Sequence, residues 1–359
     1  MAMDIRELLQ FMVKQNISDI HLKAHCAPLI RLNGRLIAAH QDQFTPELVK
    51  NMAFSLMNDA HKRRFEEQGE LDMSYSLDKV SRFRVNVYRQ KGTVAATLRV
   101  IPLDLKTFED LHLPTAPLKN FCAAPSGLVL IAGITGAGKT TTMNAMVNHL
   151  NETYTYNVIS IEDPIEFYHT DKKSSVSQRE VGNDTQSFHT ALKFILRQDP
   201  DVIVIGEMRD PETIAAAITA AETGHLVLST IHTADALHTL QRIIDSYPAE
   251  QAGAMRTTLA NVLRGVVAQK LLQTADGKGR VPCTEILTVN SYLRQLIAEG
   301  KTAELYTAMA RSQNDSLSTF DQDLFRLCNA GAITKETALA EAARPENLQS
   351  MLQGITVRM

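Results

Sequence analysis

The stretch GLVLIAGITGAGKTTT, residues 127–142, decides the fold of this chain. It opens with Leu128–Ala132, an apolar run of strand length, and continues through the pattern G-x-x-x-x-G-K-[ST] into a predicted helix. The glycines let backbone N–H groups turn toward a phosphate without Cβ clashes, and the helix points the positive end of its dipole at the same place. This order of strand, loop and helix predicts a nucleotide-binding P-loop in an α/β domain.

The P-loop pattern assigns roles to its residues. Lys139 is expected to neutralise charge on the β- and γ-phosphates, and Thr140 to give its hydroxyl to Mg²⁺. We therefore expect ATP with Mg²⁺ as the ligand. The predicted nucleotide-binding residues are Gly133, Ile134, Thr135, Gly136, Ala137, Gly138, Lys139, Thr140 and Thr141. A structural glycine-rich turn is the alternative, and a chance match in a chain of this length is on the order of one in a hundred.

The residues after the P-loop alternate between buried strands and helices. Apolar runs at Val158–Ile161, Val202–Ile205 and Leu226–Ile231 follow the first strand, and such runs are typical of a parallel sheet covered on both faces. The sequence predicts a RecA-like ATPase core over residues 126–288. A mainly helical C-terminal region is expected over residues 289–359.

The residues before the P-loop predict a smaller α+β domain, residues 1–105. Apolar spacing indicates an amphipathic helix at residues 4–15, Asn33-Gly34 indicates a hairpin turn, and a helical stretch runs from about Pro46 to Phe65. Short β-rich runs lie around Ile20–Leu22, Leu29–Leu32, Met73–Ser76, Phe83–Tyr88 and Val94–Val100. Residues 106–125 are rich in proline and predict a linker with one helical turn.

Composition excludes several classes of protein. Lys and Arg number 37 against 40 acidic residues, which gives no basis for a basic nucleic-acid-binding surface. The four cysteines are scattered, so the sequence predicts neither a zinc site nor a disulfide framework. No apolar run approaches the length of a membrane span, and the N-terminus lacks the apolar core of a signal peptide. We expect a soluble, cytoplasmic protein.

Two groups of carboxylates follow predicted strands, where ligands gather in open α/β sheets. Glu207 comes two residues after the run Val202–Ile205 and is a candidate for anchoring Mg²⁺, with an ordinary surface-turn acid as the alternative. Glu162, Asp163 and Glu166 follow the preceding strand. From the residues alone, any of these three can be the general base for an attacking water.

Two histidines bracket the predicted strand Leu226–Ile231. His232 follows its carboxyl end, so we expect it to sense the γ-phosphate. His225 precedes the strand and lies at the opposite edge of the sheet, where an interface or a structural role is expected.

The combination resembles the secretion and twitching ATPases, and within them the PilT/PilU group of type IV pilus retraction motors. The resemblance runs nearly end to end. Its motifs are Ser18-Asp-Ile-His21, Arg82-Phe-Arg84, the P-loop, an Asp box at Ile161–Phe167, Gln178-Arg-Glu-Val, a Walker B region from Arg197 to Asp210, and a His box from Ala220 to His232. Several motifs in the right order are more specific than a P-loop alone.

The resemblance implies a role for each matching residue. Glu166 is the catalytic base, Glu207 holds the water shell of Mg²⁺, and His225 and His232 form the His-box pair. Arg84 and Arg99 reach the phosphates from an N-terminal domain that is similar to PAS domains. The family assembles as a ring-shaped homo-hexamer, so active sites are expected between subunits.

The resemblance also implies where the protein works. It implies a cytoplasmic protein, peripheral at the inner face of the cell membrane. There it acts on an inner-membrane pilus platform protein, and a homologous retraction ATPase is a further candidate partner. No direct contact with nucleic acid is expected.

Two departures from the family pattern bear on the direction of work. The extension ATPases carry a four-cysteine zinc module, whereas this chain has only the short stretch from Thr274 to Arg280 there, which favours retraction. PilT members carry a helix with two arginines, and this chain keeps Arg294 but has Ala298 at the second position. The tail after Phe320 is closer to PilU, so a PilT-like or a PilU-like role stays open.

Other functions remain as alternatives. The same core serves other secretion ATPases and nucleic-acid translocases, although a translocase predicts a basic, aromatic-lined channel and this chain has 6% aromatic residues and no tryptophan. A weakly hydrolysing or non-hydrolysing accessory to a paired pilus motor is a further alternative. A small-molecule kinase is disfavoured because no lid or acceptor motif is apparent.

Overall fold

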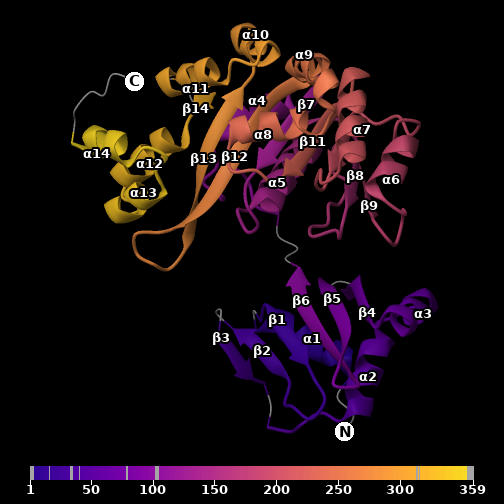
Figure 1. Cartoon of the computed structure of the whole chain (residues 1–359). Helices are drawn as coiled ribbons and strands as arrows, with labels where there is room; N and C mark the ends of the chain where they lie inside the picture. Colours follow the sequence, from indigo (N-terminus) through magenta and orange to yellow (C-terminus); the bar gives the residue numbers. More distant parts are fainter. Residues whose placement is uncertain are drawn as a thin grey trace. The chain divides into compact units, whose positions relative to one another are not determined.

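The computed structural model describes residues 4–15, 17–32, 35–39, 41–77, 80–101, 105–312, 314 and 316–353 (Figure 1). The chain divides into two compact units. The first is Met1–Asp104 with Pro164–Tyr168, and the second is Leu105–Asp163 with His169–Met359. The boundaries predicted near residues 125 and 288 fall inside the second unit and stay predictions. The Asn33-Gly34 turn lies outside the described residues.

The first unit contains a six-stranded antiparallel sheet in the order β3-β2-β1-β6-β5-β4. Its strands are β1 (Asp19–Leu22), β2 (Leu29–Leu32), β3 (Arg35–Ala38), β4 (Glu70–Leu77), β5 (Ser81–Gln90) and β6 (Thr93–Ile101). Its helices are α1 (Ile5–Lys14), α2 (Pro46–Ser55) and α3 (Asp59–Gln68). Strands β2 and β3 pair as the predicted hairpin.

The two faces of this sheet differ in polarity, as the alternation of strand residues requires. The apolar face packs against the helices: Ile20, Phe83 and Leu98 of the sheet and Leu9 of α1 are fully buried there. The other face carries rows of polar residues across the strands. One row runs Arg31, Asp19, Arg99, Arg84 and Ser74 in cross-strand register.

The sequence predicted one helical stretch from Pro46 to Phe65, whereas the structure has two helices there, so the prediction of a single helix was wrong. The first helix, α2, ends at Ser55. Asn58 then caps α3, because its side chain accepts a hydrogen bond from the backbone N–H of His61 at 2.8 Å. Asparagine favours this competing local bond over the helix interior.

The second unit contains an eight-stranded sheet in the order β14-β13-β12-β7-β11-β10-β8-β9. Its strands are β7 (Gly127–Ala132), β8 (Asn157–Glu162), β9 (Ser175–Glu180), β10 (Val202–Ile205), β11 (Leu226–Ile231), β12 (Leu263–Gln273), β13 (Arg280–Thr288) and β14 (Leu317–Ser318). The six neighbouring strands β12, β7, β11, β10, β8 and β9 pair in parallel. Strands β13 and β14, at the other end of the sheet, pair in antiparallel orientation. The four apolar runs form parallel strands, as predicted, and the two antiparallel strands that the runs did not include make the whole sheet mixed.

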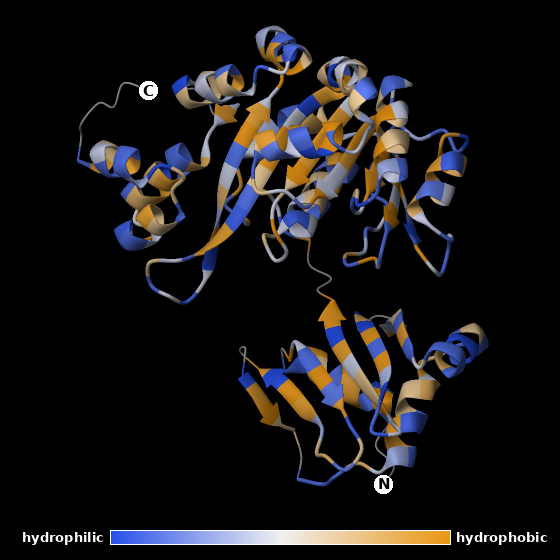
Figure 2. Ribbon diagram, in the orientation of Figure 1, coloured by the Kyte–Doolittle hydropathy of each residue, from blue (hydrophilic) through white to orange (hydrophobic). Residues whose placement is uncertain are grey.

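Helices cover both faces of this sheet, and the central strands β7, β10 and β11 are buried on both sides (Figures 1 and 2). On one face Val129, Ile131 and Val204 pack with helices α4 and α5. On the other face Leu128 and Leu130 pack with α6 to α9. These helices are α4 (Thr115–Cys122), α5 (Lys139–Thr153), α6 (Phe188–Ile195), α7 (Pro211–Glu222), α8 (Ala236–Ile244), the 3₁₀ turn Ala249–Gln251 and α9 (Ala252–Val262). The predicted α/β class is confirmed.

Helix α4 lies where the sequence predicted a linker with one helical turn. Pro117 is tolerated because it falls in the first turn, where its missing N–H costs no helical bond. Leu118 and Phe121 are buried against the sheet, so tertiary packing stabilises a helix that the proline content argued against.

The C-terminal region is helical, as predicted, but the antiparallel strand β14 belongs to it. Its helices are α10 (Ser291–Glu299), α11 (Thr302–Arg311), α12 (Phe320–Asn329), α13 (Lys335–Glu341) and α14 (Pro345–Leu352). Among the described residues, no helix is long and apolar enough to cross a membrane.

A buried carboxylate joins this region to the core. Glu285 on β13 accepts the backbone N–H of Ala236 at 2.9 Å and that of Phe320 at 3.4 Å, which are the first residues of α8 and α12. Burial, with the charges of Asp235 and Asp321, raises the pKa of Glu285 to about 7 even though the two N–H groups lower it.

Glu285 should make the protein less stable as pH rises. Its folded pKa lies above the unfolded value of 4.5, so the native state holds the extra proton between these values. Stability from this group is present below the unfolded pKa and is lost as pH rises through about 7. Chemical unfolding should show the loss of about 2 kcal/mol between about pH 5.5 and pH 7.5, at about 1.4 kcal/mol per pKa unit.

Glu285→Gln should remove this slope, whereas Glu250→Gln, at an exposed carboxylate, should keep it. Equal slopes in the wild type and in Glu285→Gln would contradict the assignment.

Candidate active site

The P-loop connects β7 to α5 and has the backbone geometry that its glycines allow. Gly133, Gly136 and Gly138 have φ angles of 155°, 81° and 87°. An L side chain rarely adopts such angles, so these positions favour glycine. The loop delivers the N-terminus of α5, which begins at Lys139, to the carboxyl edge of the sheet.

The lysine of the motif lies inside the loop. The side chain of Lys139 is 7% exposed, and its ammonium donates hydrogen bonds to the carbonyls of Gly133 and Ile134 at 2.8 and 3.1 Å. Burial lowers the pKa of Lys139. The loop carbonyls thus hold the ammonium inside the P-loop.

Gln269 on β12 supports the P-loop, and sequence reasoning missed it. Its amide accepts the hydroxyl of Thr142 at 2.7 Å and donates to the carbonyl of Ala137. A Cβ at Gly138 would come within 2.9 Å of that amide nitrogen. A single buried glutamine on a later strand carries no motif, so only the fold could reveal it.

Parallel pairing brings Glu207 and His232 to the same edge as the P-loop. Ile231, the last residue of β11, pairs with Ala132 at the end of β7, and β10 lies on the other side of β11. Glu207 follows β10, and one of its carboxylate oxygens is 3.1 Å from His232 Nε2. Glu207 also pairs with Arg209, a second residue that sequence reasoning did not single out.

The surroundings of His232 disfavour its protonated form. Its pKa is lowered, first by burial and then by the positive charges of Lys139 and Arg209. His232 is therefore mainly neutral at neutral pH. A cavity of about 370 Å³ opens here, lined by Glu207, Met208, Arg209, Ile231, His232 and Arg242.

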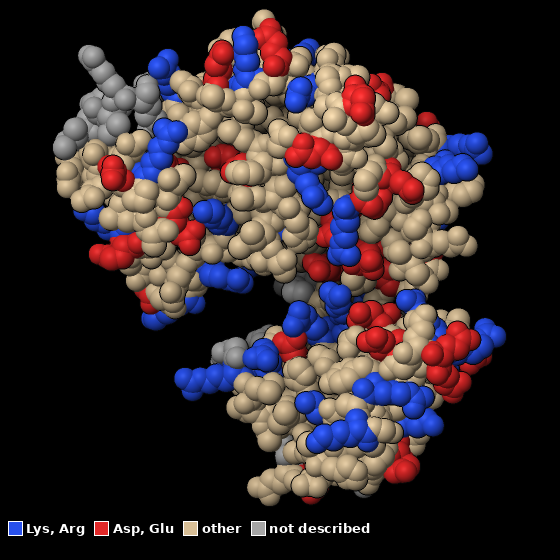
Figure 3. Space-filling view, in the orientation of Figure 1, with Lys and Arg blue, Asp and Glu red and all other residues tan. Residues whose placement is uncertain are grey.

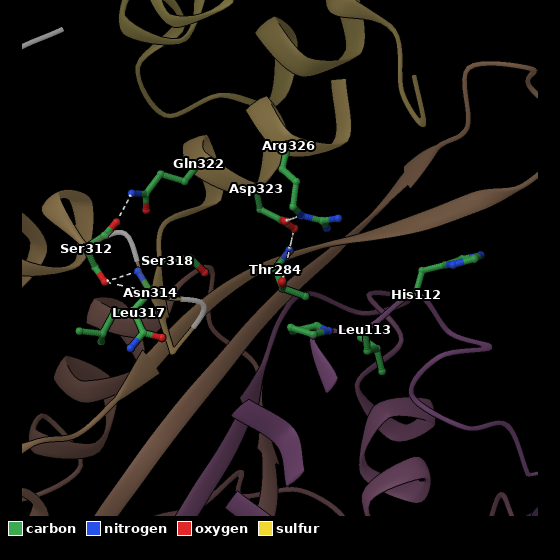
Figure 4. A pocket seen from close by; sticks show the side chains of 11 residues that line it. His112, Leu113, Thr284, Ser312, Asn314, Leu317, Ser318, Gln322, Asp323 and Arg326 are labelled. Carbon is green, nitrogen blue, oxygen red and sulfur yellow. Dashed lines mark hydrogen bonds and ion pairs between the residues drawn. The ribbon is translucent and has the colours of Figure 1, made fainter. Parts of the chain in front are cut away.

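A second cavity, of about 360 Å³, lies elsewhere in this unit (Figure 4). Its wall contains His112 and Leu113, Thr284 of β13, and Asp323 and Arg326 of α12. Asp323 and Arg326 pair with each other at 2.7 Å. None of its lining residues belongs to the P-loop or to the Walker B and His-box turns, so it is not the nucleotide site.

The structure does not bring His225 to this edge within one chain. Leu226, the next residue, pairs with Gly127 and Val202 at the start of their strands. The His225 ring nitrogen Nδ1 is 2.9 Å from the carbonyl of Ala220, to which it donates. This matches the structural role that strand geometry favoured, and its membership of a catalytic pair stays a prediction.

The three candidate bases have different surroundings. Glu162 is 4% exposed and its Oε1 accepts the Ser160 hydroxyl at 2.7 Å, so its carboxylate is already engaged. Asp163 is exposed and Glu166 is half-buried. Glu166 belongs to the segment Pro164–Tyr168, which is grouped with the first unit, so its role as base stays a prediction.

The two family arginines are cross-strand neighbours on the polar face of the first unit. Arg84 pairs in register with Arg99, and the Arg99 guanidinium is 2.7 Å from the buried carboxylate of Asp19. The side chain of Arg99 is 65% exposed. Contact with phosphate stays a prediction for both residues.

The donor set fits a magnesium nucleotide. Thr140 is half-buried at the start of α5 and offers a hydroxyl, and Glu207 offers carboxylate oxygens at the same sheet edge. Mg²⁺ prefers such oxygen ligands and keeps much of its water.

Three comparisons bear on this site. Residues 1–278 match the family described as "Type II/IV secretion system protein". The chain is 42% identical to the "Type IV pilus retractation ATPase PilT" of Pseudomonas aeruginosa, over 96% of this chain and 100% of the relative. It is 40% identical to the "Type IV pilus ATPase PilU" of the same organism, over 98% and 92%. The crystal structure of the pilus retraction motor PilT with bound ADP matches with a TM-score of 0.91 and 40% identity, covering 97% of this chain and all of that one.

Gln269→Ala should weaken nucleotide binding while leaving the fold intact. The variant removes the hydrogen bonds that Gln269 makes to the Ala137 carbonyl and to the Thr142 hydroxyl. We expect this to reduce the binding free energy by about 1–2 kcal/mol, which raises the dissociation constant for ADP about tenfold. Calorimetric titration with Mg·ADP measures it. Gln273→Ala, at an exposed position of the same strand, is the matched control and should bind as the wild type does. Equal affinities for all three proteins would refute the support role.

Proposed function

The chain belongs to the type II/IV secretion system protein family, and from this membership we propose that it is a hexameric ATP-hydrolysing motor for type IV pilus retraction. Such a motor drives pilus disassembly and twitching motility. The observation that carries the proposal is the meeting of the P-loop, Glu207 and His232 at one sheet edge, in a chain 42% identical over nearly its whole length to a retraction ATPase.

The P-loop residues bind and orient the triphosphate. The N–H groups between Gly133 and Thr140 cradle the β-phosphate, and the ammonium of Lys139 exchanges its bonds to the loop carbonyls for β- and γ-phosphate oxygens. Thr140 and Glu207 would hold Mg²⁺, Glu207 partly through water. When bound, Mg²⁺ neutralises charge on the phosphates.

Hydrolysis needs a base for the attacking water. Glu166 takes a proton from the water while its oxygen attacks the γ-phosphorus, and the bond from that phosphorus to the β–γ bridging oxygen breaks to leave ADP and phosphate. His232, held by Glu207, contacts the γ-phosphate and reports its loss. A mainly neutral imidazole can donate one hydrogen bond there without adding fixed charge.

The second unit alone does not complete the site. Arg84 and Arg99 of one subunit would contact the phosphates of the nucleotide that is bound by the neighbouring subunit in the ring. ATP binding would clamp that interface, and product release would reopen it. Successive closures would move an inner-membrane platform protein bound along the pore, at the cytoplasmic face of the membrane.

The chain is similar to both kinds of retraction ATPase, with 42% identity to a PilT and 40% identity to a PilU. A nucleic-acid translocase is disfavoured by charge, because Lys and Arg number 37 against 40 acidic residues. On the face seen in Figure 3, lysines and arginines lie interspersed with acidic residues. DNA-stimulated turnover with a steep salt dependence would support that alternative.

Glu166→Gln should abolish ATP hydrolysis and leave ATP binding intact. Removing a positioned base costs on the order of 10²- to 10⁴-fold in rate. Steady-state phosphate release measures it, with Asp163→Asn as the neighbouring control that should keep its turnover. An active Glu166→Gln variant beside an inactive Asp163→Asn would move the base to Asp163.

The same proteins test the motor. Light scattering with ATP should give a particle of six chains for the wild type and for Glu166→Gln. In cells lacking the chromosomal gene, wild type should restore twitching and Glu166→Gln should not. A monomer that binds ATP without hydrolysing it would instead support the accessory role.

Arg84→Ala and Arg99→Ala should each abolish turnover, because each would remove a cation from a neighbour's phosphates. Arg89→Ala, on the opposite face of β5, is the control and should remain active. Mixing Arg84→Ala with Glu166→Gln subunits should recover part of the activity, since some interfaces then join an intact arginine to an intact base. Full activity of both arginine variants would refute action across subunits.

A further inference from the structure

A buried histidine that follows the Asp box forms a hydrogen bond with the P-loop helix α5. His169 follows the segment 163–168 that contains Glu166 and is 8% exposed. Its Nε2 is 2.8 Å from Oδ1 of Asn144, in the second turn of α5. The Asn144 amide in turn donates to the carbonyl of Thr140 at 2.8 Å. Two short side-chain bonds therefore connect a nucleotide-binding residue with the segment of the predicted base.

The direction of these bonds is fixed by the partners. The Thr140 carbonyl can only accept, so the Asn144 nitrogen must face it and the Asn144 oxygen must face His169. His169 Nε2 therefore carries the proton and donates. The other ring nitrogen, Nδ1, is buried without a hydrogen-bond partner among the described residues. A proton there would be unsatisfied, in agreement with the pKa of about 4 to which burial lowers this histidine.

The two ends of the segment share one anchor. The backbone N–H of His169 donates to the Gln178 side-chain oxygen at 2.9 Å, and the Gln178 amide nitrogen donates to Glu162 Oε1 at 3.0 Å. Glu162 is the last residue of β8, and Gln178 lies on the neighbouring strand β9. Residues 163–168 are thus held at both ends by Gln178, and at the far end also by α5.

We propose that Asn144 and His169 are positioning residues for Glu166, which couple the first turn of α5 to the segment carrying the base. The proposal rests on the proposed function, because it takes Glu166 as that base. When Thr140 engages the nucleotide, its turn fixes Asn144, and Asn144 fixes the chain three residues beyond Glu166 through His169. Nucleotide binding and placement of the base then become one event.

The proposal predicts a loss in turnover without a matching loss in binding. A misplacement of about 1 Å at a reacting group can cost about 100-fold in rate. Asn144→Ala and His169→Ala should therefore lower kcat by about 10- to 100-fold with little change in KM. His169→Gln, which can still donate from a nitrogen in the Nε2 position, should recover most of the rate. His149→Ala, at the other end of α5, is the control and should behave as wild type.

A double variant distinguishes coupling from separate structural damage. Because both residues act through one chain of bonds, Asn144→Ala with His169→Ala should be no slower than the slower single variant. Independent effects would multiply instead. Multiplying effects, a His169→Gln variant as slow as His169→Ala, or single variants that keep the wild-type kcat would each overturn the proposal.

Hydrogen exchange provides a readout that does not depend on hydrolysis. Adding Mg·ADP to the wild type should slow exchange of the backbone amides in residues 163–168 as well as in the P-loop. In Asn144→Ala the P-loop amides should still be protected, and the segment should lose its protection. Wild-type protection of the segment in that variant would refute the coupling even if Glu166 proved to be the base. Coupled protection in a protein without turnover would refute the proposed function alone.

Discussion

The arrangement of the site depends on the parallel pairing of β8, β10, β11 and β7. Because these strands run in the same direction and in register, the residues that follow them leave the sheet at one edge. Asp163, Glu207, His232 and Gly133 follow these four strands directly or within two residues. Reversing any one strand would send its loop to the opposite edge, where His225 lies. The continuous apolar runs that allow burial on both faces are thus also what gathers the polar groups.

The sequence predicted this edge well because each contributing element has a local signature. The P-loop, the apolar strands and the acid after β10 are visible in short windows. Gln269, Asn144 and His169 were missed because each acts through a hydrogen bond to a distant part of the chain, and single polar residues carry no period. Strand β9, with the sequence SVSQRE, was missed because an edge strand need not be apolar. Helix α4 was underestimated because its stability comes from the packing of Leu118 and Phe121.

The charges around the site are arranged for an anionic ligand. Lys139, Arg209 and Arg242 surround or line the region that contains Glu207 and His232. Burial, and then the charges of Lys139 and Arg209, lower the pKa of His232, so the histidine adds no further fixed charge at neutral pH. A neutral imidazole bonded to a carboxylate can change partner when the γ-phosphate leaves, at less electrostatic cost than an ion pair would require. In the proposed mechanism the fixed charges bind the ligand, while the neutral group is suited to register its change.

The bonds from Thr140 to His169 follow the same logic inside the protein. Each nucleotide cycle changes the charge next to α5 by the loss of a phosphate, and a buried ion pair beside it would strengthen or weaken with that change. The strength of a hydrogen bond between an amide and a neutral imidazole depends less on nearby charge, and more on the direction and distance between donor and acceptor. Their donors and acceptors are fixed by the Thr140 carbonyl at one end and by the buried Nδ1 at the other, so only one pattern of bonds is available. Such a connection transmits the position of the helix and is largely insensitive to the charge of the ligand, which is what placing a catalytic base requires.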